Sequence, residues 1–314
     1  VDIGTDTTIN TDSANVHNII DDNVTLTNNA DIIKPSGGVN GIIISDDDLT
    51  GVTIINNAGA TIGVTGSADQ AVMLQDNITP TVINSGTISS GDGQAIDIRG
   101  TTGAIIINNA GGVLTARRST IRCVSVCTNP IITNSGKIIA TGFGDTGTAI
   151  LLNLSIGLIL TNNAGGEILT FGGQAIDLSN SGTFTNSGLI RALDADGKLV
   201  LSDAAAVIKF NNTNTTVLLK DEGIVVGTIS NSGDNAGSKL QIDHGYGRAY
   251  MYQTLGELEL ADLSGNRIVK GSATAVGMGA QETVDELLGL RAYNLRATLK
   301  RYADVSDPKA RMEP

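Results

Sequence analysis

One short motif recurs along this chain and constrains its fold more than any other feature. An apolar run leads into an Asn, a small residue and a Gly, and a second apolar run follows, as in "VINSGTI" at Val82–Ile88. Counted at the Asn before Ala or Ser, the copies lie 23 to 29 residues apart. They fall at Asn29, Asn57, Asn84, Asn109, Asn134, Asn163 and Asn186. A period of this length is typical of a stacked repeat protein.

A second apolar motif falls once in each period, always after the Asn motif. Examples are "QAVML" at Gln70, "QAIDI" at Gln94 and "QAIDL" at Gln174. Each period thus holds three short runs rich in Ile, Val, Leu and Thr, which favour β-strands. Helical repeats would need 3.6-residue spacing, and leucine-rich repeats would need Leu at fixed offsets. We predict an all-β fold, a right-handed parallel β-helix with about 25 residues per turn, over residues 1–216.

The Asn motif fits the bend between two sheets of such a helix. A sharp bend needs a residue that tolerates left-handed φ, and Asn and Gly are those residues. Stacked Asn side chains can also form a hydrogen-bonded ladder from turn to turn. We therefore interpret these Asn residues as structural rather than catalytic.

The charge of the chain is concentrated in its N-terminal third. The net charge is −12, and residues 1–98 contain thirteen Asp and a single basic residue, Lys34. Phosphate backbones and anionic lipids would be repelled by that end, so we expect no nucleic acid partner and no membrane-surface binding.

The two cysteines, Cys123 and Cys127, lie four residues apart with no His nearby. That set is too small for a zinc site, which needs about four ligands. Cys123 aligns with inward positions of other repeats such as Ile98, which is compatible with a buried thiol. A small disulfide loop is the alternative. The spacing does not decide between them.

The pattern changes toward the C-terminus. Residues 217–275 read as irregular strands that would cap the open end of the β-helix. Residues 276–305 contain an amphipathic helix, Gln281–Ala303, with acidic residues in its first turns and basic residues in its last turns, as the helix dipole favours. Residues 306–314 form a tail.

In its order of parts, the chain resembles the passenger region of bacterial autotransporters, the type V secretion system. The resemblance rests on the NSG and NNAG turns, the β-helix with a distinct cap, and the final helix. It implies a passenger displayed on the bacterial cell surface or released after cleavage, and a cap that acts as an autochaperone. It also implies that the helix enters an outer-membrane β-barrel of the same precursor.

Catalytic patterns are weak, and we expect no enzyme. His244 follows Asp243 directly, so the two side chains would point to opposite faces of a strand. Asp97 and Asp177 occupy equivalent places three periods apart, which puts them about 14 Å from each other, whereas glycosidic carboxylate pairs lie about 5 to 10 Å apart. Arg122 would form a surface ion pair with Asp97. A β-helix lyase or hydrolase acting on polysaccharide remains the alternative function.

Acidic turns could in principle hold calcium. "SDDDL" at Asp46–Asp48 and "DADG" with Asp194 and Asp196 offer oxygen ligands, but the second lacks the closing Glu of a twelve-residue calcium loop. We interpret both as solvated turns and expect no metal ion or cofactor.

We expect an adhesin that binds through the long side face of the β-helix, either to a copy of itself on a neighbouring cell or to a host surface protein. Glycan binding is less supported because the first aromatic residue is Phe143. An inert stalk is a third possibility. The predicted contact residues are the exposed acidic residues of the N-terminal third, namely Asp21, Asp22, Asp46, Asp47, Asp48 and Asp69.

Overall fold

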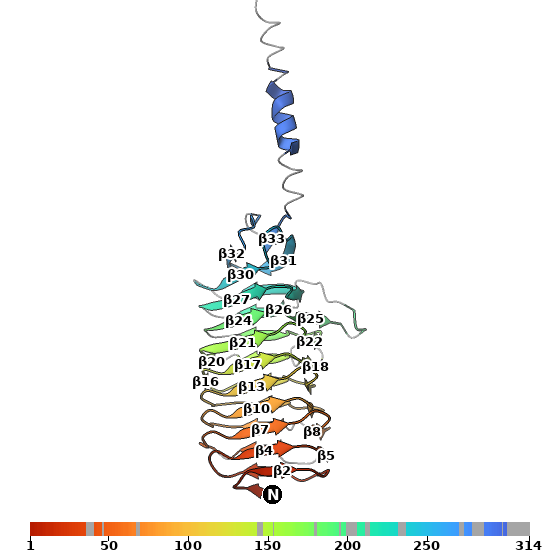
Figure 1. Cartoon of the computed structure of the whole chain (residues 1–314), viewed down its shortest axis with the longest axis vertical. Helices are drawn as coiled ribbons and strands as arrows, with labels where there is room; N and C mark the ends of the chain where they lie inside the picture. The colour runs from red at the N-terminus through yellow and green to blue at the C-terminus, as the bar shows by residue number, and fades with distance from the viewer. Residues whose placement is uncertain are drawn as a thin grey trace, which may run out of the picture.

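In the computed structural model the chain is a parallel β-solenoid, a coil of short strands with about seven turns of about 26 residues. Figure 1 shows the turns stacked along one axis from the N-terminus, with a single helix beyond the far end. The predicted all-β parallel β-helix is confirmed. The structure describes residues 1–35, 41–45, 47–66, 70–142, 147–152, 154–178, 181–194, 196–198, 206–210, 214–231, 237–269, 273–277, 286–296 and 298–299.

Most turns contribute one strand to each of three sheets, and the first and last turns have no strand in the third sheet among the described residues. Sheet A has the strand order β1-β3-β6-β9-β12-β15-β19-β23-β26-β29-β31-β33. These strands are β1 (Asp2–Ile3), β3 (His17–Ile19), β6 (Gly41–Ser45), β9 (Gln70–Leu74), β12 (Ile96–Asp97), β15 (Ile121–Arg122), β19 (Ile150–Leu152), β23 (Ile176–Leu178), β26 (Ala206–Phe210), β29 (Thr228–Asn231), β31 (Tyr250–Leu255) and β33 (Ala273–Ala275).

Sheet B follows sheet A in every turn and has the order β2-β4-β7-β10-β13-β17-β21-β24-β27-β30-β32. Its strands are β2 (Thr7–Ile9), β4 (Thr25–Asn28), β7 (Thr53–Asn56), β10 (Thr81–Asn84), β13 (Ile105–Asn108), β17 (Ile131–Asn134), β21 (Leu158–Asn162), β24 (Gly182–Asn186), β27 (Thr215–Lys220), β30 (Lys239–Asp243) and β32 (Glu259–Asp262).

Sheet C closes the turn with the order β28-β25-β22-β18-β14-β11-β8-β5. Its strands are β5 (Asp31–Pro35), β8 (Thr61–Thr65), β11 (Thr87–Ser90), β14 (Val113–Ala116), β18 (Lys137–Ala140), β22 (Glu167–Phe171), β25 (Leu189–Leu193) and β28 (Ile224–Val226). A short pair, β16 (Cys127–Thr128) and β20 (Ser155–Ile156), lies at the corner between sheets A and B.

The core is a set of columns of like side chains. In sheet B, Leu26, Ile54, Val82, Ile106, Ile132, Leu160 and Phe184 stack in register and are buried. Because neighbouring turns present the same residue class at the same position, each turn covers the apolar side chains of the next. The scarcity of aromatic residues, 3% of the chain, suits this narrow interior filled by branched aliphatic side chains.

A ladder of buried Asn side chains runs along the bend between sheets B and C. Each Nδ2 donates to the Oδ1 of the Asn one turn further on, at 2.8 to 2.9 Å. The members are Asn28, Asn56, Asn84, Asn108, Asn134, Asn162 and Asn186. The predicted ladder exists, but the predicted members Asn29, Asn57, Asn109 and Asn163 are not part of this buried row. Each of them instead donates a separate hydrogen bond to the previous turn, at 2.5 to 2.9 Å. In the NNA copies the first Asn faces inward, and the second lies outside.

The prediction that Asn or Gly supplies the left-handed backbone at this bend is confirmed for Gly and not for Asn. In the longer NNAG bends the left-handed residue is the Gly, with φ of 83°, 84° and 81° at Gly59, Gly111 and Gly165. Left-handed Asn residues occur instead at the corner between sheets A and B, at Asn23 and Asn129. Asn is therefore selected at the B-to-C bend for its amide and not for its backbone.

Parallel pairing continues beyond residue 216, where we predicted the end of the β-helix. β27 pairs in parallel with β30, and β30 with β32. Antiparallel pairing occurs between β31 and β33. These pairings do not show independently folding units, so the division into a β-helix and a cap at residues 217–275 stays a prediction.

The predicted terminal helix is present over the described residues 286–296 and 298–299. The proposed ends at Gln281 and Ala303, and the tail at 306–314, lie outside the described residues. Its large apolar side chains are all exposed, from 53% at Leu290 to 71% at Tyr293. No described part of the chain covers this helix.

Candidate contact surface

Four of the predicted acidic contact residues, Asp21, Asp22, Asp47 and Asp48, lie at corners between sheets A and B. Asp21, Asp22, Asp47 and Asp48 are exposed, and Asp46 and Asp69 lie outside the described residues. Two of them have a structural role. The backbone N–H of Thr50 donates to Asp22 Oδ1 at 2.7 Å, and Asp48 has a left-handed φ of 63°, which Asp tolerates better than most residues.

Other N-terminal carboxylates replace missing backbone acceptors. Asp6 Oδ1 accepts the N–H of Thr25 at 2.8 Å, and Asp12 Oδ1 accepts the N–H of Asp31 at 3.1 Å. One turn later, the N–H of Thr53, which is equivalent to that of Thr25, donates to the carbonyl of Val24 instead. The concentration of Asp at this end is therefore partly explained by hydrogen bonding of the backbone of the first turns.

On sheet A, the predicted pair between Asp97 and Arg122 is present, but it is not a surface pair. The Asp97 side chain is fully buried, and its Oδ2 lies 2.5 Å from Nη2 of both Arg122 and Arg99. The two guanidinium groups cover the carboxylate. Asp97 is therefore a buried, ion-paired group and not a solvated acid at the surface. Asp177 lies three turns away in the same column, as predicted, so the two acids do not converge on one site.

On sheet C, charges also pair across turns. Glu167 Oε1 accepts two hydrogen bonds from Arg191, from Nε at 2.9 Å and Nη2 at 2.6 Å, and Glu167 Oε2 lies 3.8 Å from Lys137 Nζ. Lys137 and Glu167 are in register on neighbouring turns, whereas Arg191 is in register with Leu169 and reaches Glu167 from the neighbouring column. The charges of sheets A and C are largely matched within the molecule.

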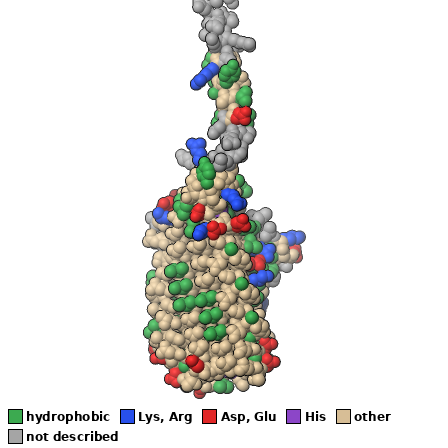
Figure 2. Space-filling model, viewed as in Figure 1, with side chains coloured by type: hydrophobic (Ala, Val, Ile, Leu, Met, Phe, Trp, Pro, Cys, Tyr) green, Lys and Arg blue, Asp and Glu red, His purple; other side chains and the backbone are tan. Residues whose placement is uncertain are grey.

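Sheet B differs from the other two because its outer face carries no charge over seven turns. On β4, β7, β10, β13, β17, β21 and β24, every outward side chain is Thr or Ile. Figure 2 shows the result as a band of hydrophobic side chains that crosses a surface free of charge at mid-height, while charged side chains gather toward the ends and the margins. We call these fourteen residues the Thr/Ile face.

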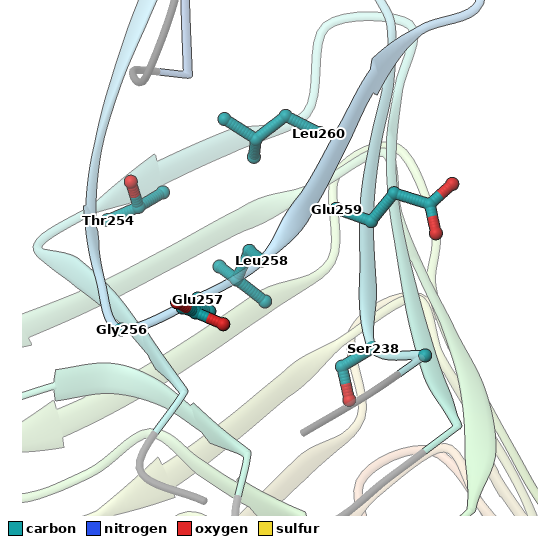
Figure 3. Close-up of a pocket in the computed structure, with 8 residues that line it drawn as sticks. Ser238, Thr254, Gly256, Glu257, Leu258, Glu259 and Leu260 are labelled. Atoms are coloured by element: carbon teal, nitrogen blue, oxygen red, sulfur yellow. The ribbon is translucent and has the colours of Figure 1, made fainter. Parts of the chain in front are cut away.

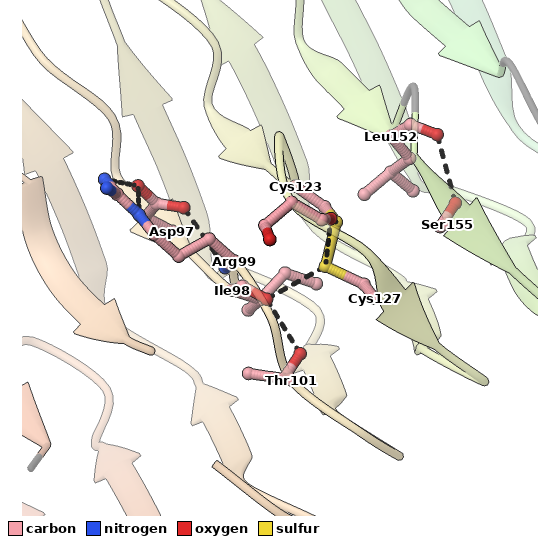
Figure 4. Close-up of a disulfide and its surroundings, with 9 residues drawn as sticks. Asp97, Ile98, Arg99, Thr101, Cys123, Cys127, Leu152 and Ser155 are labelled. Atoms are coloured by element: carbon pink, nitrogen blue, oxygen red, sulfur yellow. Dashed lines mark hydrogen bonds and ion pairs between the residues drawn. A yellow bond between two sulfur atoms is a disulfide. The ribbon is translucent and has the colours of Figure 1, made fainter. Parts of the chain in front are cut away.

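The corner beside this face carries further exposed apolar residues and a disulfide. Cys123 and Cys127 are bonded to each other and buried, so the open question of thiol or disulfide resolves to a buried disulfide. Figure 4 shows the disulfide together with the hydrogen bonds that take its place in the neighbouring turns. In the turns on either side a hydroxyl holds the same corner, with Thr101 donating to the Ile98 carbonyl at 2.8 Å and Ser155 to the Leu152 carbonyl at 3.0 Å.

The depression drawn in Figure 3 has a volume of about 440 Å³ and lies near the C-terminal end of the solenoid. It is lined by Gly237, Ser238, Thr254 and residues 256–260. Its two acids are Glu257 and Glu259, and Lys239 Nζ lies 3.2 Å from Glu259 Oε1. Figure 3 shows the Glu259 carboxylate pointing away from Leu258 and Leu260.

A second depression of about 310 Å³ contains His244. Its Nδ1 lies 2.7 Å from the Asp221 carbonyl and its Nε2 lies 2.6 Å from the Tyr252 hydroxyl. Because a carbonyl can only accept, Nδ1 carries a proton, and the Tyr252 hydroxyl also donates to the Gly223 carbonyl at 3.1 Å. Burial raises the pKa of Tyr252 to about 12, so the phenol stays protonated at neutral pH. The predicted satisfied histidine is what the structure shows.

Nearby, Tyr250 donates to Asp262 Oδ2 at 2.8 Å. Burial, together with the hydrogen bond to Asp262, raises the pKa of Tyr250. Burial alone would raise the pKa of Asp262, but hydrogen bonds from Asn266 and Tyr250 outweigh it and lower that pKa. The polar groups of this cluster bond to one another.

The acidic turn at Asp194 and Asp196 is held by its own backbone. Asp194 Oδ1 accepts the N–H groups of Asp196 and Lys198 at 2.9 and 2.8 Å. Within the described residues, no group of three or more His, Cys, Asp or Glu is placed to hold a metal ion.

Sequence reasoning missed the Thr/Ile face. Its signal is the repeated strand text "TLTN", "TIIN", "TVIN", "IIIN", "IITN", "ILTN" and "TFTN", whose first and third letters are always Thr or Ile. Isoleucine at an inward and at an outward position looks the same in a single strand, so the pattern is visible only when the turns are aligned.

Comparison with known proteins gives no family assignment: no family model matches the sequence, and neither a curated protein nor a solved structure matches it significantly. Among the described residues, no helix combines the length and the apolar character needed to cross a membrane.

Proposed function

We propose that this protein is a bacterial surface adhesin of the autotransporter passenger type, acting in self-association of cells or in attachment to host surfaces. Two features support the autotransporter type: a long parallel β-solenoid and a C-terminal amphipathic helix with no partner among the described residues. The helix would then link the solenoid to the outer membrane.

The single observation that carries adhesion is the regular side of the solenoid. Seven turns present the same class of side chain at the same outward position, spaced about 4.8 Å apart, so weak contacts can repeat along an extended line. Repeated weak contacts give binding through multivalency and need no deep pocket. Asp97 is buried against two arginines, Asp177 lies three turns away from it, and Glu259 is paired with Lys239. No observation therefore favours the polysaccharide enzyme.

The test uses the 314-residue chain attached by its C-terminal end to micrometre beads or displayed on a non-aggregating bacterium. We expect the coated particles to clump and settle, and bare particles to stay suspended. A parallel sample with Asp21→Asn, Asp47→Asn and Asp48→Asn tests the acidic corners as the contact. Coated particles that neither clump nor bind host cells, together with cleavage of a polysaccharide panel, would overturn adhesion in favour of an enzyme.

A further inference from the structure

The Thr/Ile face has a two-fold pattern within its own plane. Each of the seven strands contributes two outward residues, which form two columns along the solenoid. From the N-terminus, the first column reads Thr25, Thr53, Thr81, Ile105, Ile131, Ile159, Thr183, and the second reads Thr27, Ile55, Ile83, Ile107, Thr133, Thr161, Thr185. The second column read backwards matches the first. The six Ile therefore form one oblique band that looks alike from either end.

A patch that is complementary to itself suits a contact between identical molecules. In an isologous contact the same surface meets itself, so it must be complementary to its own copy. A band of apolar side chains flanked by hydroxyls meets this condition, because apolar groups pack on apolar groups and Thr hydroxyls both donate and accept. Ile131 and Ile159, at 37% and 50% exposed, have apolar surface available to bury.

The distribution of charge on the molecule also favours a contact between two copies at the Thr/Ile face. The chain carries a net charge of −12, so two copies repel each other at most orientations. The Thr/Ile face is where two copies can approach without bringing a charged side chain of the described strands into the contact. On sheets A and C, by contrast, ion-paired groups such as Lys137, Glu167 and Arg191 would have to be desolvated.

We infer that two copies of this chain meet through the Thr/Ile face of sheet B. The inference rests on the adhesive function proposed above and places its contact on this face, away from the acidic corners. Seven strands of four residues cover about 400 Å², roughly half of the 800 Å² per partner typical of a stable complex. A single pair of molecules therefore binds weakly, and arrays of molecules on two facing surfaces bind firmly.

The test changes Ile83 and Ile131, which are equivalent under the two-fold pattern. Ile83→Asp with Ile131→Asp brings like charges together in the contact, and clumping of coated beads should fall by about tenfold or more. The control is Ile33→Asp with Ile224→Asp on sheet C, where the two side chains are 39% and 53% exposed. The control should clump like the parent.

A mixing experiment identifies the partner as a second copy. Beads with Ile83→Lys and Ile131→Lys should not clump alone, but should clump with the Asp-substituted beads, because opposite charges now meet. Circular dichroism and thermal unfolding check the fold. If the Asp variant does not fold, Ile83→Thr with Ile131→Thr replaces it, since Thr already occupies these columns, and a smaller loss of clumping is expected.

Failure of the inference differs from failure of the function. Parent beads that clump, with folded Asp variants that clump equally, would overturn this face while leaving adhesion standing. Lost clumping without rescue on mixing would overturn direct pairing of copies. Parent beads that never clump would overturn the self-association on which the inference rests.

Discussion

Asparagine has two distinct roles in neighbouring positions of this chain. In the NNAG bends the first Asn is buried, and its amide hydrogen-bonds to the Asn of the next turn and to backbone carbonyls. The second Asn lies at the surface and reaches back to the previous turn, as Asn109 Nδ2 does to Ser85 Oγ at 2.9 Å. The same residue type therefore contributes differently to the free energy of unfolding at two adjacent positions.

Replacing Asn108 by Ala should lower the free energy of unfolding by about 2 kcal/mol or more, because the Asn84 amide loses its acceptor and the Asn134 Oδ1 loses its donor inside the protein. Asn109→Ala removes one partly exposed hydrogen bond and should cost about 0.5 kcal/mol. Urea unfolding of the two variants measures the difference. Equal losses would mean that the ladder adds nothing to stability beyond an ordinary surface contact.

His17 gives the first turns a dependence on pH. It begins β3, is 6% exposed, and both of its ring nitrogens lack a hydrogen-bond partner. Burial lowers the pKa of His17 from its usual 6.5. The unfolded chain therefore takes up a proton near pH 6.5 while the folded chain does not. Stability from the neutral ring is present above that pH and is lost as the pH falls below it.

We expect the urea midpoint of the parent protein to fall between pH 7.5 and pH 5.5. In His17→Leu this component is absent, and the fall should be smaller. The same fall in both proteins would assign the pH dependence to other groups.

At the scale of the elements, the corner between sheets A and B is held by one link in each of three successive turns. In two turns the link is a hydroxyl-to-carbonyl hydrogen bond, from Thr101 and from Ser155. In the turn between them it is the disulfide, which spans one residue more. The covalent bond thus replaces a hydrogen bond in a slightly longer loop.

Removing the disulfide by Cys123→Ala and Cys127→Ala should cost about 2 kcal/mol of unfolding free energy, the value expected from the chain entropy of a five-residue loop. Cys123→Leu with Cys127→Ser copies the residues of the next turn, Leu152 and Ser155, and should lose less. Thermal unfolding of both variants tests this. If the copied pair is as unstable as the Ala pair, the hydroxyl link does not substitute for the disulfide.

The sheets were predictable from the sequence because each turn repeats the same three apolar runs. The inward register of the Asn ladder was not, because the NNAG bends are longer than the NSG bends. Alignment on the small residue after Asn84 and Asn109 pairs positions that the structure separates. The short bend also needs its Gly for space: a Cβ at Gly86 would collide with the carbonyl of Ala60.

The burial of Asp97 could not be read from the sequence either. Its two partners lie 2 and 25 residues away, and only the stacking of β12 on β15 brings Arg122 next to the carboxylate. The charge pattern predicted the partner, and the structure alone shows that Arg99 joins from the same turn. The acidic contact residues stay a prediction for the same reason: exposure at a corner does not distinguish a turn from a binding site.

At the scale of the whole molecule, the solenoid is close to one-dimensional: each turn contacts the turns before and after it. We therefore expect the fold to tolerate the removal of a whole turn. A cut between Asn84 and Asn109 removes β11, β12 and β13 and joins the two residues into a new Asn-Asn-Ala-Gly bend like the natural ones.

Deletion of residues 85–108 should leave a folded β-protein with one cooperative transition and an m-value lower by roughly a tenth, since the m-value follows the surface exposed on unfolding. Deletion of residues 85–96, half a turn, joins the end of a sheet B strand to a sheet A strand and should prevent folding. Circular dichroism and urea unfolding compare the two. Equal stability of both deletions would contradict a fold built from in-register turns.

The Asn ladder also has a direction. All six amide-to-amide bonds run from the N-terminal turn toward the C-terminal turn, so the side-chain dipoles add along the axis of the molecule. Inverting one amide in mid-row breaks the bonds on both sides, and inverting the entire row requires every member to rotate together. The row therefore has a summed dipole along the axis of the solenoid, and the direction of this dipole distinguishes the N-terminal end from the C-terminal end.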